Sequence, residues 1–377
     1  QFEESISSSF QGIGAEIQER NGMISVVSPI KNSPAEKAGI LTNDNIIAVD
    51  GKNIQGMGAS EAVLLIRGEK GTEVTLTIQR GEMTEPLEIK IVRDEIPIET
   101  VYAKILDDKV AHIQITSFSQ NTYDELLAAL TEMEKAGMKA LVLDVRQNPG
   151  GLLTSALNIS DLFVEEGKPL FQTQEKDKKA EIFLATDGKK LKVPVSLLID
   201  EGSASASEIL AAAMSESAGT QLVGLNSFGK GTVQTANELK DGSNMKFTTA
   251  KWLTPDGNWI HEKGIAPDVK VDYPTYSKLP YLDASIEIKN GVLSDQVKAS
   301  EEMLTAIGID SGKVDGLFDD QTEAAVKQLQ KEAKLKETGI LTGDTTYALM
   351  DRLRLKIEKD DPQLLKAKEL LLKDLAK

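Results

Sequence analysis

The sequence predicts a multidomain protein that combines α/β and α+β folds, and three observations carry this prediction. The chain has 377 residues, enough for two or three domains that each bury a hydrophobic core. Its middle part alternates apolar strand patterns with amphipathic helix patterns, an order typical of a mostly parallel sheet. The part before it consists of short strand patterns with little helix, and the part after it is mostly helical and more charged.

Composition narrows the class of protein. The net charge is −16 and no basic block offsets it, so we expect no nucleic-acid partner. The absence of cysteine excludes disulfides, thiolate metal sites and a cysteine nucleophile. Only two histidines occur, His112 and His261, which leaves few ways to build a metal site or a serine-histidine-aspartate triad. We expect both histidines to be structural, and we predict neither a metal nor a cofactor.

The start of the chain carries little information of its own. Residue 1 is glutamine, so we expect residues 1–9 to be the remnant of a preceding helical segment. No run of 18 apolar residues appears, and no transmembrane helix is therefore expected within the sequence.

The first predicted domain spans residues 10–94 and is built mainly of strands. The stretches "MISVVSPI" and "EVTLTIQR" alternate like strands, whereas "SPAEKAGI" and "GASEAVLLIRG" have the pattern of helices. The order of "FQGIGAEI", "SPAEKAGILTNDNIIAVDGKNI" and "LIRGEKGTEVTLTIQR" resembles a PDZ domain over its whole length. This resemblance implies a domain that binds the free C-terminus of a protein or peptide.

The peptide-binding residues of this domain are predicted from its glycine-containing loop. Glycines in the loop let consecutive backbone N–H groups converge on a terminal carboxylate, while the next strand pairs with the peptide. Three interpretations of Arg67 stay open: it assists the carboxylate, it contacts a neighbouring domain, or it is only the solvated end of a helix. The loop residues are Gly12, Ile13, Gly14 and Ala15.

The second predicted domain spans residues 95–284. Helix patterns are "TYDELLAALTEMEKAG", "LTSALNISDLFVEEG" and "SEILAAAMSESAG", and buried strand patterns are "KALVLDV", "VPVSLLID" and "TQLVGLNS". The stretch "MKFTTAKWLTPDGNWI" predicts a hairpin with Asp256 and Gly257 at its turn. We therefore expect an α/β core with a later hairpin.

One serine of the stretch "DEGSASASEI" stands out. Ser205 lies three residues before Glu208, which forms a capping box ahead of an apolar helix pattern. The preceding strand places Ser205 at the C-terminal edge of the sheet, where α/β proteins bind ligands. Backbone N–H groups and the helix dipole there stabilise a developing oxyanion. The alternative is that Ser205 only caps the helix, which contributes about 1 kcal/mol.

Lys230 in "NSFGKGTVQT" is the candidate base for such a serine. It can act only when neutral, so its pKa would have to fall by about 3 from 10.4, and we expect it to be largely buried. Gln234 follows four residues later and would face Lys230 if the segment is helical. The stretch lacks the spacing of a phosphate-binding loop.

Four stretches in this order resemble the carboxy-terminal processing (tail-specific) serine proteases: "LVLDVRQNPGG", "GSASASEILAAAM", "SFGKGTVQT" and "HEKGIAPDVKV". The resemblance implies a crotonase/ClpP-like protease core with Ser205 as nucleophile, Lys230 as general base and Gln234 as its orienting partner. It also implies an oxyanion hole made by Ala206 together with Gly150 or Gly151. The whole layout is similar to the CtpB type of spore-forming Gram-positive bacteria, and Asp144 and Arg146 would then form a structural ion pair.

The third predicted domain spans residues 285–377 and is helical. "DGLF" at 315–318 and the helix from Thr322 to Gln330 resemble a peptidoglycan-binding-like module. Such a module either binds peptidoglycan or pairs subunits, and we favour a homodimer. The final stretch "DPQLLKAKELLLKDLAK" is amphipathic and is expected to pack on a neighbour or on a second subunit.

The combined resemblance implies an endopeptidase that cleaves proteins near their C-termini. We expect peptide binding to move the PDZ domain about a hinge at "RDEIPIET" and so to complete the catalytic geometry. Such an enzyme would process extracytoplasmic or membrane signalling proteins, as in sporulation, and would be secreted, periplasmic or in an intermembrane space. Two alternatives are a non-catalytic PDZ adaptor that tethers membrane or cell-wall proteins, and a crotonase-like acyl-CoA enzyme, for which no nucleotide site is found.

Overall fold

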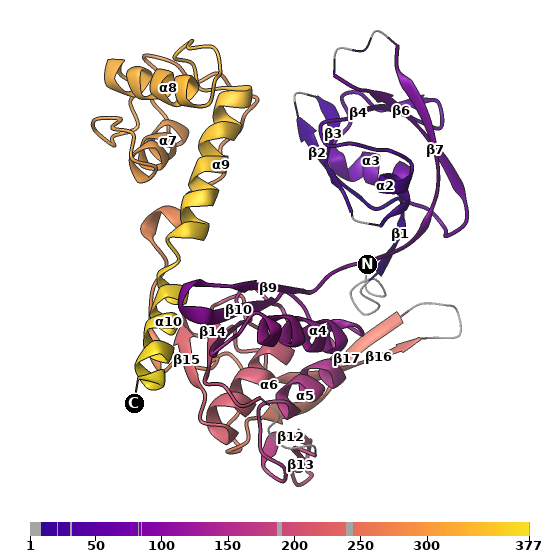
Figure 1. Ribbon diagram of the computed structural model, residues 1–377, viewed down its shortest axis with the longest axis vertical. Coiled ribbons are helices and arrows are strands. Elements are labelled where there is room, and N and C mark those ends of the chain that lie inside the picture. The colour runs from indigo at the N-terminus through magenta and orange to yellow at the C-terminus, as the bar shows by residue number, and fades with distance from the viewer. Residues whose placement is uncertain are drawn as a thin grey trace. The chain divides into compact units, whose positions relative to one another are not determined.

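The computed structural model describes residues 9–20, 22–30, 32–81, 83, 85–186, 191–238 and 244–376, with main chain only at 235–238, 244 and 246 (Figure 1). Residue contacts divide the described chain into two units. One contains residues 98–273 and 361–376, and the other contains residues 9–97 and 274–360. The chain therefore leaves the first unit and returns to it at the end.

The first unit is built on a six-stranded sheet with the order β18-β15-β14-β11-β10-β9. All neighbouring strands are parallel except β9, which runs antiparallel to β10. The central strand β11 is buried along its whole length, as its continuous apolar sequence predicts. The strands are β9 (Val101–Ile105), β10 (Val110–Ile115), β11 (Ala140–Asp144), β14 (Val195–Ile199), β15 (Gln221–Gly224) and β18 (Val269–Lys270).

Helices cover both faces of this sheet. On one face, α4 (Thr122–Lys135), α5 (Leu153–Asp161) and α6 (Ala206–Ala212) pack on side chains such as Leu141 and Leu143 of β11. A π-helical segment, Ala213–Ser217, extends α6. Successive strand residues point to opposite faces, so the alternate β11 residues line the other face, which one further helix covers.

That further helix is α10 (Pro362–Leu375), the last helix of the chain. Its apolar stripe, Leu364, Ala367 and Leu371, packs on β11, β14 and β15 (Figure 1). Its sequence predicts a helix of the tail domain that packs on a neighbour or on a second subunit. The neighbour is the sheet of the protease core, because the stripe matches the apolar face that the other helices leave uncovered.

A small antiparallel sheet lies in the same unit, with the order β13-β12-β17-β16. The turn predicted at Asp256 and Gly257 forms, with the Gly257 N–H donating to Thr254 O at 2.9 Å. The predicted hairpin around it is wrong, since no strand follows in the described residues 258–268 and β17 pairs with the preceding β16. The strands are β12 (Pro169–Glu175), β13 (Glu181–Leu184), β16 (Thr232–Glu238) and β17 (Asn244–Leu253).

The N-terminal part of the second unit is mostly strand. Its main sheet has the order β2-β3-β4-β6-β7, with β5 paired to β4, and β1 pairs separately with β8. Two helices pack there as predicted, α2 (Pro34–Lys37) and α3 (Ala59–Ile66). The strands are β1 (Ser9–Gly12), β2 (Ala15–Arg20), β3 (Met23–Pro29), β4 (Asn45–Val49), β5 (Lys52–Asn53), β6 (Glu73–Gln79), β7 (Leu87–Val92) and β8 (Asp94–Pro97). Half of the hinge expected at 93–100 is thus an ordered strand.

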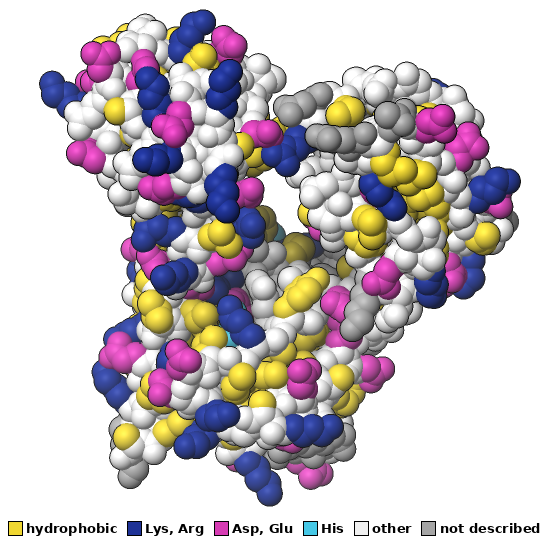
Figure 2. All heavy atoms as spheres, turned by 45° about the horizontal axis from the view of Figure 1, so that its top comes forward, with side chains coloured by type: hydrophobic (Ala, Val, Ile, Leu, Met, Phe, Trp, Pro, Cys, Tyr) yellow, Lys and Arg dark blue, Asp and Glu magenta, His cyan; other side chains and the backbone are white. Residues whose placement is uncertain are grey.

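The rest of the second unit is helical. Its three main helices are α7 (Asp295–Ala306), α8 (Asp320–Glu332) and α9 (Gly343–Lys359), and α8 contains the predicted helix from Thr322 to Gln330. They share one core, to which Phe318 of the "DGLF" turn contributes a fully buried ring. On the face of the molecule seen in Figure 2, basic and acidic side chains are interspersed.

Candidate active site

Ser205 lies in the sharp turn between β14 and α6. Its φ of 56° and ψ of −111° are unusual for a residue with a side chain, and such strain is common where a strand turns abruptly into a helix to present a nucleophile. The other two serines of the stretch are fixed structurally. Ser203 donates its hydroxyl to Val145 O at 2.8 Å, and Ser207 donates to Asn148 O at 2.9 Å.

A buried carboxylate joins the Ser205 turn to the lysine-containing loop. Glu208 is fully buried, and its Oε2 accepts the N–H of Ser205 and the N–H of Lys230, both at 2.8 Å. Its Oε1 accepts the hydroxyl of Ser227 and the N–H of Gly229, both at 2.6 Å. The capping-box pattern predicted the first bond. The other three bonds to Glu208 could not be predicted from the local pattern, because their donors lie about twenty residues further along the chain.

Lys230 has a firmly held main chain and a half-buried side chain. Its carbonyl accepts the indole N–H of Trp252 at 2.7 Å, while its own N–H is held by Glu208. The side chain is thus partly but not fully buried, and the prediction of a largely buried lysine stays a prediction. Lys230 immediately precedes the start of β16, an edge strand of the small sheet, which leaves its side chain partly exposed.

Gln234 lies on β16, and its side chain is exposed. The helical geometry that would make Gln234 face Lys230 is not present, because residues 232–238 pair with β17. Its β-branched residues, such as Thr232 and Val233, favour a strand over a helix. The i, i+4 argument that placed Gln234 against Lys230 therefore does not apply.

The "NPGG" turn packs directly against Ser205. A Cβ atom on Gly150 would lie 2.9 Å from Ser205 Cβ and 3.0 Å from Ala206 N, and Gly150 has a φ of +101°. A Cβ on Gly151 would lie 2.0 Å from Phe118 O, so neither glycine has room for a side chain. The N–H of Gly150 donates to Asn148 Oδ1 at 2.9 Å. Within the described part of the chain, no acceptor takes the N–H of Gly151 or of Ala206.

A second buried carboxylate, Asp144, lies at the end of β11. Arg146 donates to both of its oxygens, at 2.9 and 2.7 Å, and His112 Nε2 lies 2.9 Å from Oδ2. Burial would raise the pKa of Asp144, but Arg146 and His112 lower it well below its usual range. The ion pair expected between Asp144 and Arg146 is present. Arg146 also contacts Asp361 at 2.6 Å, immediately before α10, which the sequence did not reveal.

His261 lies beside the lysine-containing loop. Its Nδ1 accepts the N–H of Gly231 at 3.4 Å, and its ring stacks on Trp259 with centroids 5.3 Å apart. Over the described ranges, no group of three or more histidine, aspartate or glutamate side chains is placed to hold a metal. In the same ranges no helix is long and apolar enough to cross a membrane.

The predicted carboxylate-binding loop lies between β1 and β2. Gly14 has a φ of +76° and its carbonyl accepts from Ile30 N and Ser33 Oγ, which fixes the turn. No acceptor among the described residues takes the N–H of Ile13 or Gly14. The strand β2 that begins at Ala15 is an edge strand, with one side open to pairing.

Arg67 directly follows α3. Its guanidinium lies 4.8 Å from the ring centroid of Phe10, and its Cγ would be 3.7 Å from a Cβ atom on Gly12. Arg67 is therefore next to the predicted loop, on its β1 side.

Comparison with known proteins accounts for all three parts of the chain. Family models match as Peptidase family S41 at residues 109–271, as a PDZ domain at 11–91 and as a peptidoglycan binding domain at 294–349. The core sheet, the strained serine turn and the PDZ domain thus define a serine peptidase. The chain belongs to the carboxy-terminal processing proteases of peptidase family S41.

Two relatives from Bacillus subtilis strain 168 illustrate the similarity. The carboxy-terminal processing protease CtpA is 50% identical over 99% of this chain and 80% of its own length. The protease CtpB is 42% identical over 97% of this chain and 77% of its own length, so the comparisons do not single out the CtpB type. Among solved structures, the photosystem II D1 C-terminal processing protease is 30% identical, with a TM-score of 0.43, over 72% of this chain and 74% of that one.

Proposed function

We propose that Ser205 is the nucleophile of this peptidase and that Lys230 is the base that takes its proton. The observation that carries the proposal is the shared contact with Glu208. The N–H groups of Ser205 and Lys230 both donate to the same oxygen at 2.8 Å, so their nitrogens lie no more than twice that distance apart. Backbones held this close allow the hydroxyl of the strained serine and the amine of the lysine to meet, as a serine-lysine protease requires.

In the proposed reaction, the neutral amine of Lys230 accepts the proton as Ser205 Oγ attacks the peptide carbonyl. The oxyanion then accepts hydrogen bonds from the N–H of Ala206 and from the "NPGG" turn. We assign the second donor to Gly151, since the N–H of Gly150 is bound to Asn148. Lys230 next passes its proton to the leaving amine, and water hydrolyses the acyl-enzyme by the same route.

The partial exposure of Lys230 supports a role for substrate in completing the site. A bound peptide would exclude water from the amine, and desolvation favours the neutral form that a base requires. Gln234 would then orient the amine, because an uncharged amide on β16 does not raise the pKa of the lysine. The catalytic residues are Ser205, Lys230 and Gln234.

The experiment that tests this proposal follows hydrolysis of an unstructured protein by purified variants. We expect Ser205→Ala and Lys230→Ala each to lower kcat/KM by about 10³-fold or more, as for other catalytic nucleophiles and bases. Lys263→Ala, an exposed lysine near the same loop, is the matched control and should retain activity. Cleavage by a folded Ser205→Ala or Lys230→Ala variant at the wild-type rate would overturn the assignment.

We propose further that the PDZ domain captures the substrate C-terminus at Gly12, Ile13, Gly14 and Ala15, with Arg67 nearby, and that this capture activates the protease. The unengaged N–H groups of Ile13 and Gly14 and the open edge of β2 support this part of the proposal. Peptides with a free carboxylate should therefore be cleaved faster than the same peptides with a C-terminal amide. Equal rates for the two would contradict recognition of the carboxylate.

The family and the domain composition support a place for the enzyme outside the cytoplasm. We propose that it processes extracytoplasmic or membrane signalling proteins, as in sporulation, and acts as a homodimer. The helical module either pairs subunits or binds peptidoglycan. Analytical ultracentrifugation of the full chain tests whether subunits pair. Co-sedimentation with purified peptidoglycan tests whether the chain binds it.

A further inference from the structure

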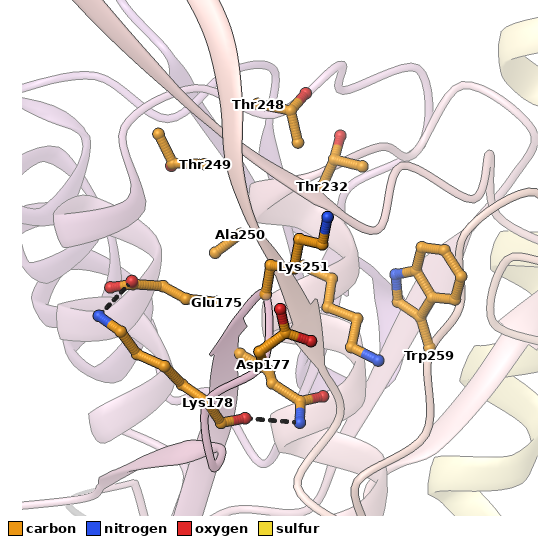
Figure 3. A pocket seen from close by; sticks show the side chains of 11 residues that line it. Glu175, Asp177, Lys178, Thr232, Thr248, Thr249, Ala250, Lys251 and Trp259 are labelled. Atoms are coloured by element: carbon orange, nitrogen blue, oxygen red, sulfur yellow. Dashed lines mark hydrogen bonds and ion pairs between the residues drawn. The ribbon is translucent and has the colours of Figure 1, made fainter.

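A cavity of about 600 Å³ lies over the small sheet of the protease unit, within the size range of ligand-binding sites (Figure 3). Its walls come from the turn between β12 and β13 and from strands β16 and β17. Figure 3 shows the ion pair of Glu175 and Lys178 on one side and Trp259 on the other. Threonine hydroxyls and a partly exposed indole therefore share one hollow with charged groups.

This cavity borders the segment that contains the proposed base. Thr232, which lines it, lies two residues after Lys230. Trp259, which also lines it, donates its indole N–H to Gly231 O at 2.8 Å. The only other tryptophan of the chain, Trp252, donates to Lys230 O. Successive carbonyls of the lysine-containing segment are thus held by two indoles, and one of these indoles forms a cavity wall.

We propose that this cavity is a subsite for an extended segment of the substrate polypeptide, and that Trp259 links its occupancy to the position of Lys230. The inference rests on the proposed function of Ser205 and Lys230. It adds a binding site at a defined place, the hollow between the β12–β13 turn and Trp259.

The wall chemistry fits a polypeptide. The hydroxyls of Thr232 and Thr248 can donate to and accept from peptide groups. The indole of Trp259 is 44% exposed, although His261 stacks on it and the Lys251 amine lies 5.4 Å from its ring centroid. Its remaining exposed surface can contact apolar side chains while its N–H stays bonded to Gly231. The edge strand β16 begins at Thr232 and offers unpaired backbone groups alongside.

The first experiment uses the full-length Ser205→Ala variant and a peptide that the wild type cleaves. Trp252 is 1% exposed and Trp259 is 44% exposed, so acrylamide should quench mainly the fluorescence of Trp259. We expect a saturating concentration of the peptide to reduce this quenching at least twofold. In the double variant Ser205→Ala, Trp259→Phe, the peptide should have no effect on the quenching. The PDZ domain contains no tryptophan, so binding there alone gives no direct protection. If fluorescence anisotropy shows that a labelled peptide saturates the protein while the acrylamide quenching is unchanged, the proposal is overturned.

The second experiment fills the cavity from its far wall. Lys176 lines the cavity and is exposed on the β12–β13 turn, and Lys179 is exposed on the same turn but does not line it. We expect Lys176→Trp to raise KM about tenfold with kcat within twofold, and Lys179→Trp to behave as wild type. Equal kinetics for the two variants would overturn the subsite. Failure of the proposed catalytic residues has a different signature, namely cleavage that persists in Ser205→Ala.

Discussion

Two carboxylates of the protease unit are equally buried but are compensated in different ways. Glu208 receives four hydrogen bonds from neutral donors, namely three backbone N–H groups and one hydroxyl. Asp144 is instead compensated mainly by the charge of Arg146, and it also forms hydrogen bonds with the Arg146 N–H and the His112 ring. Both side chains are fully buried.

The difference follows from what each carboxylate holds together. Neutral N–H donors fix directions and distances, which suits two catalytic loops that must meet with little positional error. A guanidinium reaches further and binds several carboxylates at once, which suits the joining of distant segments. Arg146 connects the end of β11 to Asp361, across 215 positions of sequence. Glu208 thus fixes the Ser205 turn against the loop that contains Lys230, and Asp144 with Arg146 attaches the last helix to the core.

The largest effect on stability is expected from Arg146→Met. This change leaves Asp144 buried beside only a histidine and removes the link to Asp361, so the free energy of unfolding should fall by about 3–5 kcal/mol. Urea unfolding followed by tryptophan fluorescence measures it, because both tryptophans lie in the same unit. The double variant Arg146→Met, Asp144→Asn should recover part of the lost free energy of unfolding, because it no longer buries an unpaired carboxylate. A single variant as stable as wild type would show that the charge pair does not hold the fold.

The largest effect on catalysis from this pair is expected for Glu208→Gln. An amide nitrogen cannot accept from the N–H groups it would face, so two of the four bonds are lost, and stability should fall by about 1–3 kcal/mol. Displacement of Ser205 and Lys230 should lower kcat about 10²-fold, with KM little changed. Glu201→Gln, exposed in the same turn, is the control. Wild-type kcat in Glu208→Gln would remove the distinction between the two carboxylates.

The sequence predicted those features that depend on local pattern. Strand and helix periodicity located the sheet of the core, and the strand-turn-helix context selected Ser205 over Ser203 and Ser207. Local pattern also predicted the bond between Ser205 and Glu208. These features require only residues that are close in the chain.

Features that depend on distant residues were missed. The three further bonds to Glu208 need a loop that the sheet topology brings close, and no periodicity encodes that meeting. The return of α10 to the core was missed because an amphipathic stripe shows that a helix is covered but not by what. The condition under which Gln234 would face Lys230, a helical segment, is not met, because this segment is a strand that pairs with β17.

Acid should weaken the attachment made through Asp144. Its pKa is lower in the folded protein than the usual 3.9 of the unfolded chain, so the unfolded state binds a proton first as the pH falls. Stability from this group is therefore complete above about pH 5 and is lost progressively below that, by at most about 1.4 kcal/mol per pH unit. Between about pH 5 and 3, the unfolding free energy of Asp144→Asn should therefore depend less steeply on pH than that of the wild type. An unchanged slope, as expected for the exposed control Asp124→Asn, would exclude Asp144 as the titrating group.

The smallest effect is expected from Asp361→Asn, which separates the two roles of Asp361. Asparagine still caps α10, since its side-chain oxygen can accept from the N–H groups of Gln363 and Leu364. Only the charge that faces Arg146 is removed, and stability should fall by about 1 kcal/mol, with kcat and KM unchanged. The neighbouring Asp360→Asn affects an ion pair with Lys356 in the other unit, so the tryptophan-detected transition should not move. If the two variants unfold alike, the cap rather than the charge attaches α10, and Asp144 with Arg146 serves the core sheet alone.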